Sequence, residues 1–175
     1  MIKSNKNFGT ESKKPYLIGI FIDYDNLEIG LSKLGLHFDY RIILNYLEGF
    51  GNLEVSIAYG DWENNNKAAK ELSSCNISIK HTVIRKNPHE KKNYTDPQMI
   101  SDISEIFYRY PEIDLFVICS GDSHFFPVIE KIKQQSDKKI FIISEKYSLN
   151  RIYLRGPKKV DKVIIYQELL KLFKI

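Results

Sequence analysis

Residues Leu17–Asn26 read LIGIFIDYDN, an apolar run that ends abruptly in two aspartates. Six successive apolar or glycine residues, rich in isoleucine, are typical of a strand buried on both faces, as in a parallel sheet covered by helices. Ligands bind beyond the carboxyl ends of such strands, so Asp23 and Asp25 are expected at the functional edge of the sheet. Alternatively, Asp25 or Asn26 only caps the helix that follows.

The composition is that of one well-cored domain. The chain has 175 residues, 43% of them hydrophobic, and 26 Lys and Arg against 22 Asp and Glu give a net charge of +4. This mild basic surplus is compatible with a polyanionic partner. The polar segment 1–15 is expected to be a flexible tail without the apolar core of a signal peptide, and no run reaches a membrane-spanning length. We therefore expect a single domain over residues 16–175 of a cytoplasmic protein.

Strand-like and helix-like segments alternate along the chain. Apolar runs predict strands near residues 17–22, 53–59, 77–84, 115–119, 140–143 and 162–166, the third of them at an edge of the sheet. Helical spacing separates the strands, whereas the basic and turn-rich segment 85–95 is expected to be a loop. The pattern predicts an α/β, three-layer α/β/α sandwich with a Rossmann-like, mostly parallel sheet of about five to six strands.

Three aspartates are expected to converge at one edge of this sheet. Asp23 follows the first strand, Asp122 follows the fourth, and Asp96 precedes Pro97 as the expected N-cap of a helix. Carboxylate oxygens suit Mg²⁺ or Mn²⁺, with water and substrate phosphate completing the octahedron. Such a site is suited to hydrolysis of phosphodiesters. By contrast, His37, His81 and His89 have no metal partners at a suggestive spacing and are expected to be ordinary side chains.

Four motifs stand out along the chain: Asp23-x-x-Asn26, YGDW at Tyr59–Trp62, KNYTD at Lys92–Asp96 and SGDSHFFP at Ser120–Pro127. Together they resemble a known family, the NYN domain of the PIN-like nuclease superfamily, in its bacterial LabA/DUF88-like group. The resemblance spans residue 16 to the end of the chain. It implies a PIN-like fold, an acidic site for Mg²⁺ or Mn²⁺, and often endoribonuclease activity on RNA.

The resemblance also implies roles for single residues. Asp23, Asp96 and Asp122 match the family's acids and are expected to be catalytic metal ligands, and Asn26 matches an asparagine that holds a ligand or the loop. Where many relatives have a second aspartate, this chain has His124, which puts a two-metal arrangement in doubt. His124 is expected to face the metal or the substrate phosphate.

Further residues are expected to orient the substrate or support the metal ligands. Asp102 matches a second helix acid, but six residues at about 100° each place it roughly 120° around the helix from Asp96, so we expect it behind the ligands and paired to a basic neighbour. Ser120 and Ser123 could donate hydrogen bonds to phosphate, although serine after a strand is also common in ordinary turns. The supporting set is Asn26, Asp25, Asp102, Ser120 and Ser123.

A second set is expected to contact nucleic acid. Basic residues of the 85–95 loop can neutralise phosphates, and aromatic rings can stack on unpaired bases. The alternatives are a merely solvated loop and, for the tryptophan, a packing anchor. The set is Arg85, Lys86, Lys91, Lys92, Trp62 and Tyr24.

These residues favour a metal-dependent endoribonuclease, with RNA as partner and specificity supplied by another protein or by self-association. One alternative is a nuclease-dead nucleic-acid-binding or regulatory module that lost part of its site through His124. A haloacid-dehalogenase-like small-molecule phosphatase ranks lower, because FIDYDN has Asn26 where that motif expects Thr or Val.

Overall fold

The computed structural model describes residues 14–82, 84–87, 90–155 and 160–173, and within 84–87 and 90–93 it describes the backbone alone. The expected tail over residues 1–15 therefore lies almost wholly outside the described residues.

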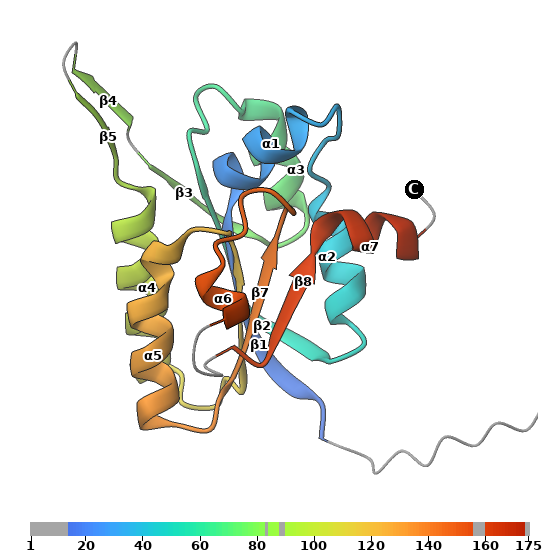
Figure 1. Ribbon diagram of the computed structural model, residues 1–175, viewed down its shortest axis with the longest axis vertical. Coiled ribbons are helices and arrows are strands. Elements are labelled where there is room, and N and C mark those ends of the chain that lie inside the picture. The colour runs from blue at the N-terminus through green and yellow to red at the C-terminus, as the bar shows by residue number, and fades with distance from the viewer. Residues whose placement is uncertain (1–13, 83, 88–89, 156–159, 174–175) are drawn as a thin grey trace, which may run out of the picture.

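The centre of the structure is a six-stranded parallel sheet with the order β3-β2-β1-β6-β7-β8. The carboxyl ends of the strands point to the top of Figure 1. The sequence prediction of a mostly parallel α/β sheet is confirmed, as is the edge position of the third strand. The strands are β1 (Tyr16–Asp23), β2 (Gly51–Gly60), β3 (Ser78–His81), β6 (Leu115–Cys119), β7 (Lys139–Ser144) and β8 (Lys162–Ile165).

Strand β1 is buried on both faces because it separates two apolar cores. Ile18, Ile20 and Ile22 are fully buried in one core, and Phe21 is fully buried in the other. Alternate side chains of a strand point to opposite faces. An unbroken apolar run is therefore what a central strand between two helical layers requires.

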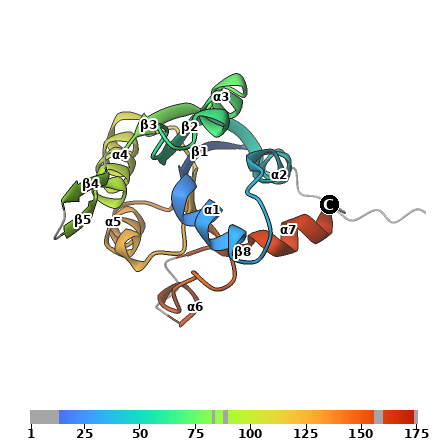
Figure 2. The same ribbon diagram turned by 90° about the horizontal axis from the view of Figure 1, so that it is seen from above.

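Helices cover both faces of the sheet. Helices α2 and α7 lie on one side and α4 and α5 on the other, and α1 lies over the carboxyl ends of the strands (Figures 1 and 2). This is the expected three-layer sandwich. The helices are α1 (Tyr24–Ser32), α2 (Tyr40–Leu47), α3 (Asn66–Ser74), α4 (Thr95–Arg109), α5 (Phe126–Gln135), α6 (Ile152–Arg155) and α7 (Tyr166–Leu172), with a 3-10 turn, η1 (Ser123–Phe125).

Two helix starts differ from the prediction. Helix α1 begins directly after β1, and its N-cap is Asp23 rather than Asp25 or Asn26. Helix α4 begins at Thr95 with Tyr94 as N-cap, so Asp96 lies in its first turn and not at the cap. Asp23 is a favoured cap residue and accepts the backbone N–H of Asn26, whereas Tyr94 makes no capping hydrogen bond through its side chain.

The segment expected to be a loop after the third strand forms an antiparallel hairpin instead. Strands β4 (Ile84–Asn87) and β5 (Glu90–Asn93) pair with each other and project from the body of the protein (Figure 1). The prediction was wrong because it relied on composition, and basic residues are unusual in strands. Two strands that pair with each other and project from the body can form without an apolar face.

Among the described residues, no helix has both the length and the apolar character needed to cross a membrane.

Candidate functional site

Asp23 lies at the end of β1, where it also caps α1. Its Oδ1 accepts a hydrogen bond from the backbone N of Asn26 at 3.2 Å, and its Oδ2 lies 3.4 Å from the Ser120 hydroxyl, which donates to it. The side chain is buried, with 4% of its surface exposed. Ser120 also accepts a hydrogen bond from the backbone N of Asp122 at 3.3 Å. Ser120 thus ties the first aspartate to the loop that carries another.

The burial of Asp23 raises its pKa from 3.8 to about 7. Burial is the largest cause, and the negative charges of Asp96 and Asp25 raise the pKa further, while the hydrogen bonds from Asn26 and Ser120 oppose it. At neutral pH the ionised form is therefore costly without a compensating positive charge. A bound cation would supply that charge.

Asp96, Asp122 and His124 form a compact group beside Asp23. Each offers a ligand atom within 4.8 Å of the others. The Nδ1 atom of His124 lies 2.8 Å from Oδ2 of Asp96 and 3.2 Å from Oδ1 of Asp122. The hydrogen bond to Asp96 and the charge of Asp122 raise the pKa of His124, so the imidazolium form is favoured here. The sequence prediction that His124 faces the site agrees with this geometry.

The side chain of Asn26 adds a further oxygen atom. Its Oδ1 is buried and has no hydrogen-bond partner, the only such side-chain atom among the described residues. An unpaired buried acceptor costs about 1–3 kcal/mol. Asn26 lines the same pocket as Asp23, Asp96 and Asp122, a cavity of about 840 Å³. These oxygen atoms are the donor set that a hard divalent cation prefers, so the residues present fit such an ion.

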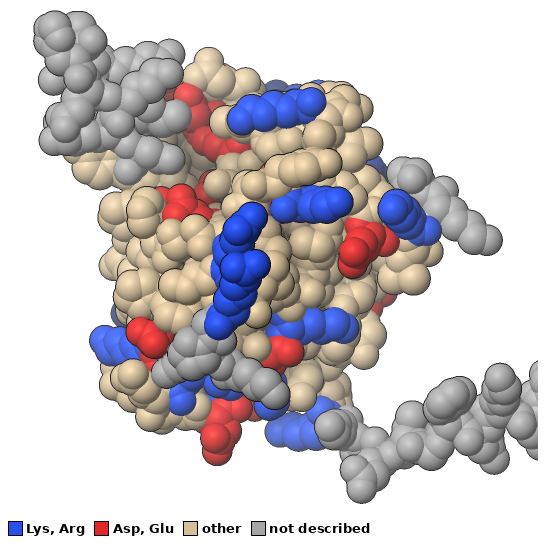
Figure 3. Space-filling view, in the orientation of Figure 1, with Lys and Arg blue, Asp and Glu red and all other residues tan. Residues whose placement is uncertain are grey.

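Acidic side chains lie recessed near the upper end of the face in Figure 3, at the end of the molecule to which the strands point. The sheet order brings β1 and β6 side by side, so the loops that follow them, with Asp23 and Asp122, meet there. Ser123 begins the turn η1 between Asp122 and His124.

Asp25 is engaged in holding the neighbouring loop. Its Oδ2 accepts from the backbone N of Asp61 at 2.9 Å, and its Oδ1 accepts from the Asn65 amide at 3.2 Å. Burial raises the pKa of Asp25. Although it lines the pocket, this carboxylate anchors the β2–α3 connection.

Asp102 lies in a buried network on α4. Its carboxylate accepts hydrogen bonds from the Tyr59 hydroxyl at 2.8 Å, the Lys80 ammonium at 2.8 Å and the Gln98 amide at 3.1 Å. The basic neighbour expected from the sequence is thus Lys80. With three donors satisfied, Asp102 fixes α4, and through it Asp96, against the sheet.

Trp62 and Tyr24 are not positioned to stack on bases. Both are buried, at 7% and 8% exposure, and their rings pack against each other with centroids 5.2 Å apart. The Trp62 indole also donates to the backbone O of Lys80 at 2.8 Å. The structure therefore corrects the expectation of stacking and supports the alternative of a packing anchor.

The basic residues expected to contact RNA are in the hairpin. The register of β4 and β5 pairs Arg85 with Lys92 and Lys86 with Lys91. Their side chains lie outside the described residues, so their role stays a prediction.

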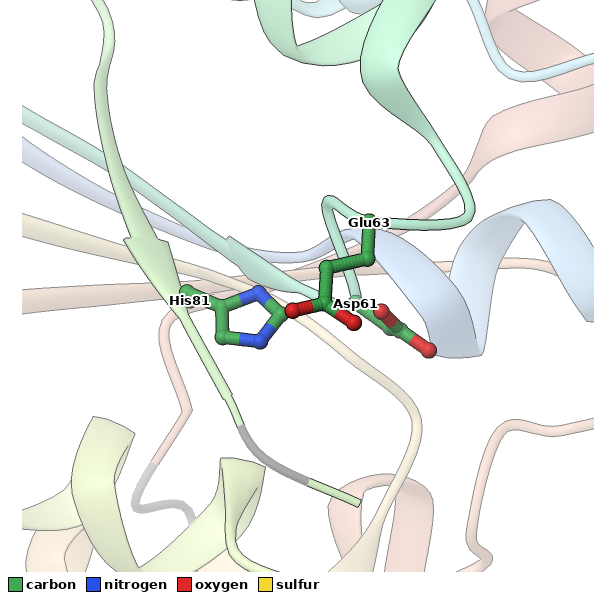
Figure 4. A group of neighbouring side chains, drawn as sticks. All are labelled: Asp61, Glu63 and His81. Carbon is green, nitrogen blue, oxygen red and sulfur yellow. The ribbon is translucent and has the colours of Figure 1, made fainter.

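A second histidine–carboxylate group lies at the rim of the pocket, which its Asp61 helps to line. Figure 4 shows Asp61 and Glu63, from the loop after β2, beside the ring of His81 at the end of β3, and their ligand atoms also lie within 4.8 Å of one another. No pattern in the sequence indicates this group, because His81 and the two acids are far apart in the chain. Two of its members have protein donors, since Trp62 N donates to His81 Nδ1 at 3.3 Å and the Asn64 amide donates to Asp61, and Glu63 and His81 are exposed to water.

Sequence analysis also missed residues of the β7–α6 connection. Glu145, Tyr147 and Ser148 line the pocket, and the Tyr153 hydroxyl donates to the backbone O of Asp122. A signal was available, because these residues directly follow a predicted strand whose carboxyl end belongs to the same edge of the sheet.

Comparison with known proteins agrees with this architecture. A protein of unknown function from Vibrio parahaemolyticus has a similar crystal structure, with a TM-score of 0.76 and 18% identity over 91% of this chain and 98% of that one. No curated protein matches the chain. The NYN domain family matches residues 17–153, which include Asp23, Asp96, Asp122 and His124. The family resemblance read from the four motifs is thereby confirmed: the chain belongs to the NYN domain family.

Proposed function

We propose that this protein is a Mg²⁺- or Mn²⁺-dependent endoribonuclease. The observation that carries the proposal is the convergence of Asp96, Asp122 and His124 beside the buried Asp23. Membership of a family of PIN-like nucleases supports nuclease chemistry in general. The acidic pocket is suited to a cation that faces an anionic substrate.

Asp23, Asp96 and Asp122 would hold the cation, and the free Oδ1 of Asn26 would contribute as a ligand or through a water. When bound, the ion supplies Lewis-acid chemistry, which stabilises charge on the phosphate and lowers the pKa of a water. The hydrogen bonds of Asp23 with Asn26 N and Ser120 Oγ hold its carboxylate in place for this role.

His124 would hold a proton at the mouth of the site. Its side chain is 67% exposed, and Asp96 fixes the ring through Nδ1, so the remaining ring nitrogen is free of that contact. An imidazolium in this position donates to a phosphate oxygen or to the departing oxygen of the substrate. The two carboxylates favour this protonated form.

One observation favours the second candidate, a nuclease-dead nucleic-acid-binding module. The same imidazolium, 2.8 Å and 3.2 Å from two carboxylates, neutralises part of the charge that would attract a cation. In that case His124 takes the place of the ion. The two candidates differ in whether added metal displaces this ion pair.

The deciding experiment incubates the protein with single-stranded RNA, single-stranded DNA and p-nitrophenyl phosphate, each in Mn²⁺, Mg²⁺ or EDTA. A circular RNA of the same sequence separates internal cleavage from digestion at ends. We expect RNA, including the circle, to be cut in metal and spared in EDTA. RNA that is bound but intact in every buffer would support the inactive module, and hydrolysis of p-nitrophenyl phosphate alone would support the phosphatase.

A further inference from the structure

We propose that Tyr147, with Ile29 and Leu34, forms a subsite that binds an unpaired base of the RNA strand next to the phosphate to be cut. This proposal rests on the proposed function, because it assigns a further part of the same substrate to the same pocket. It replaces the stacking role that the sequence placed on Trp62 and Tyr24.

Three exposed apolar or aromatic side chains line the pocket. Tyr147, Ile29 and Leu34 all line the cavity that contains the aspartates, yet 73%, 55% and 41% of their surfaces are exposed. A pocket lined both by apolar and aromatic groups and by carboxylates that could hold a cation matches the two ends of a nucleotide, whose base has apolar faces and whose phosphate is anionic. Stacking of bases on exposed aromatic rings is the usual mode of binding to single strands.

The backbone that carries Tyr147 is held by hydrogen bonds. Glu145 is buried, and its carboxylate accepts hydrogen bonds from the backbone N atoms of Tyr147, at 2.9 Å, and Ser148. The amide of Gln167, on α7, donates to the same carboxylate at 3.3 Å. An exposed ring on a fixed turn loses less conformational entropy on binding than a ring on a free loop.

The turn that carries Tyr147 is also joined to the loop of Asp122. The backbone N of Asn150 donates to the O of Gly121 at 2.9 Å. The two loops approach so closely that a Cβ at Gly121 would lie 2.5 Å from Ser144 Oγ and from Ser148 O. The backbone that carries the ring is therefore fixed relative to the loop that carries Asp122.

Helix α1 supplies a further part of the pocket wall and approaches the same turn. A Cβ at Gly30 would lie 2.7 Å from Glu145 Cγ, so only glycine permits this contact. Its neighbour Ile29 and the helix-ending Lys33 both line the pocket. The wall therefore combines an apolar side chain with a positive charge.

The charges agree with a nucleic acid occupant. Lys33 lines the pocket, and the Lys146 ammonium lies 5.7 Å from the centroid of the Tyr147 ring. The ammonium groups beside the ring can neutralise phosphates of the strand directly. The carboxylate cluster would do so through a bound cation. A base must be unpaired to reach such a ring, so the occupant is a single-stranded segment.

The test is an abasic walk, that is, a set of short single-stranded RNAs of one sequence, each of which lacks the base at a different position. Binding is measured in Ca²⁺, to limit cleavage, for wild type and for Tyr147→Ala, with one base removed at a time. In the wild type we expect one position at which base removal weakens binding by roughly 5- to 150-fold, the range of stacking on an aromatic ring. In Tyr147→Ala that penalty should vanish, while Tyr147→Phe should retain it.

Tyr108→Ala is the matched control. Tyr108 is also an exposed tyrosine, at 58%, with Lys131 Nζ 5.2 Å from its ring centroid, but it lies on α4 outside the pocket lining. It should leave every position of the walk unchanged.

Cleavage of the same intact RNA by the wild type in Mn²⁺ separates the two proposals. If the wild type cuts RNA but the walk is identical in Tyr147→Ala, the subsite is overturned and the nuclease stands. If the wild type neither binds nor cuts RNA, the proposed function fails and the subsite fails with it.

Discussion

Two groups of one histidine and two acids lie at the same end of this protein, and they differ in what surrounds them. Asp96, Asp122 and His124 adjoin a buried Asp23 whose pKa is about 7 and the unpaired buried oxygen of Asn26. In the Asp61, Glu63 and His81 group, Asp61 and His81 each accept a hydrogen bond from a protein donor, and Glu63 and His81 are exposed.

The difference teaches that proximity of ligand atoms is not enough to mark a metal site. Beside the first group, the protein buries the carboxylate of Asp23 and the unpaired oxygen of Asn26 at a cost, and a cation would reduce that cost. Within the described residues, the second group has no such buried neighbour among its hydrogen-bond partners, and two of its three residues are exposed to water. We therefore assign catalysis to the first group and use the second as an internal control.

The largest expected effect is on cleavage. Asp23→Asn, Asp96→Asn and Asp122→Asn should each lower the rate in Mn²⁺ by more than about 100-fold, because loss of a ligand exceeds the 10- to 100-fold cost of losing its supporting partner. Glu63→Gln, in the second group, should stay within about twofold of wild type. Initial rates on a labelled RNA measure this. Full activity in any of the three Asp→Asn variants would remove that residue from the site.

A second effect is on stability without metal. Asp23 binds a proton more tightly in the folded protein, at a pKa of about 7, than in the unfolded chain, at 3.8. The free-energy cost of ionising Asp23 in the folded protein therefore lowers stability progressively as the pH rises from 3.8 to about 7. Above about pH 7 this cost reaches its full value. Asp23→Asn should raise the free energy of unfolding by roughly 2–4 kcal/mol at pH 8.5 in EDTA, at 1.36 kcal/mol per pKa unit. The gain should shrink at pH 5.

Urea unfolding of the wild type, Asp23→Asn and Asp61→Asn at the two pH values provides the measurement. Asp61, in the second group, should give a small change at either pH. A destabilised Asp23→Asn at pH 8.5 would show that the carboxylate is already compensated within the protein.

A smaller effect concerns the choice of metal. When a cation displaces its proton, the imidazole of His124 offers a nitrogen that is a softer ligand than a carboxylate, and Mg²⁺ accepts it less readily than Mn²⁺. We expect wild type to favour Mn²⁺, His124→Asp to shift the preference toward Mg²⁺, and His124→Ala to lose rate yet retain some cleavage. His81→Ala is the control from the second group. The same ratio of Mn²⁺ to Mg²⁺ rates in all four proteins would place His124 outside the chemistry.

The smallest expected effect comes from the hairpin. Neutralising Arg85, Lys86, Lys91 and Lys92 together should weaken RNA binding and flatten its dependence on salt by about 0.7 in log–log slope for each lost contact. Cleavage at saturating RNA should change less. A salt slope equal to that of wild type would show that phosphates are contacted elsewhere.

The residues that sequence reasoning located and those it missed differ in how their positions are fixed. Asp23 and Asp122 directly follow apolar strands, so the strand pattern alone places them at one edge of a parallel sheet. His124 is close to Asp122 in the chain and is positioned with it. The fold followed in the same way from strand–helix alternation, and the family confirmed it.

What the sequence could not show depends on contacts between distant segments. The burial of Trp62 and Tyr24 against each other depends on how α1 crosses the β2–α3 loop. Tyr147 becomes a pocket residue only because the buried Glu145 fixes its turn. The hairpin was missed because its strands carry charge where strand patterns are read from apolar residues.

Equilibrium binding of Mn²⁺ tests the central assignment most directly, because it does not depend on the identity of the substrate. Titration followed by the loss of the free Mn²⁺ electron paramagnetic resonance signal should show binding by the wild type and by Glu63→Gln with equal affinity. Asp96→Asn and Asp122→Asn should weaken that binding by at least about tenfold. Binding that survives both of these changes and is lost in Glu63→Gln would place the ion in the second group and contradict the account.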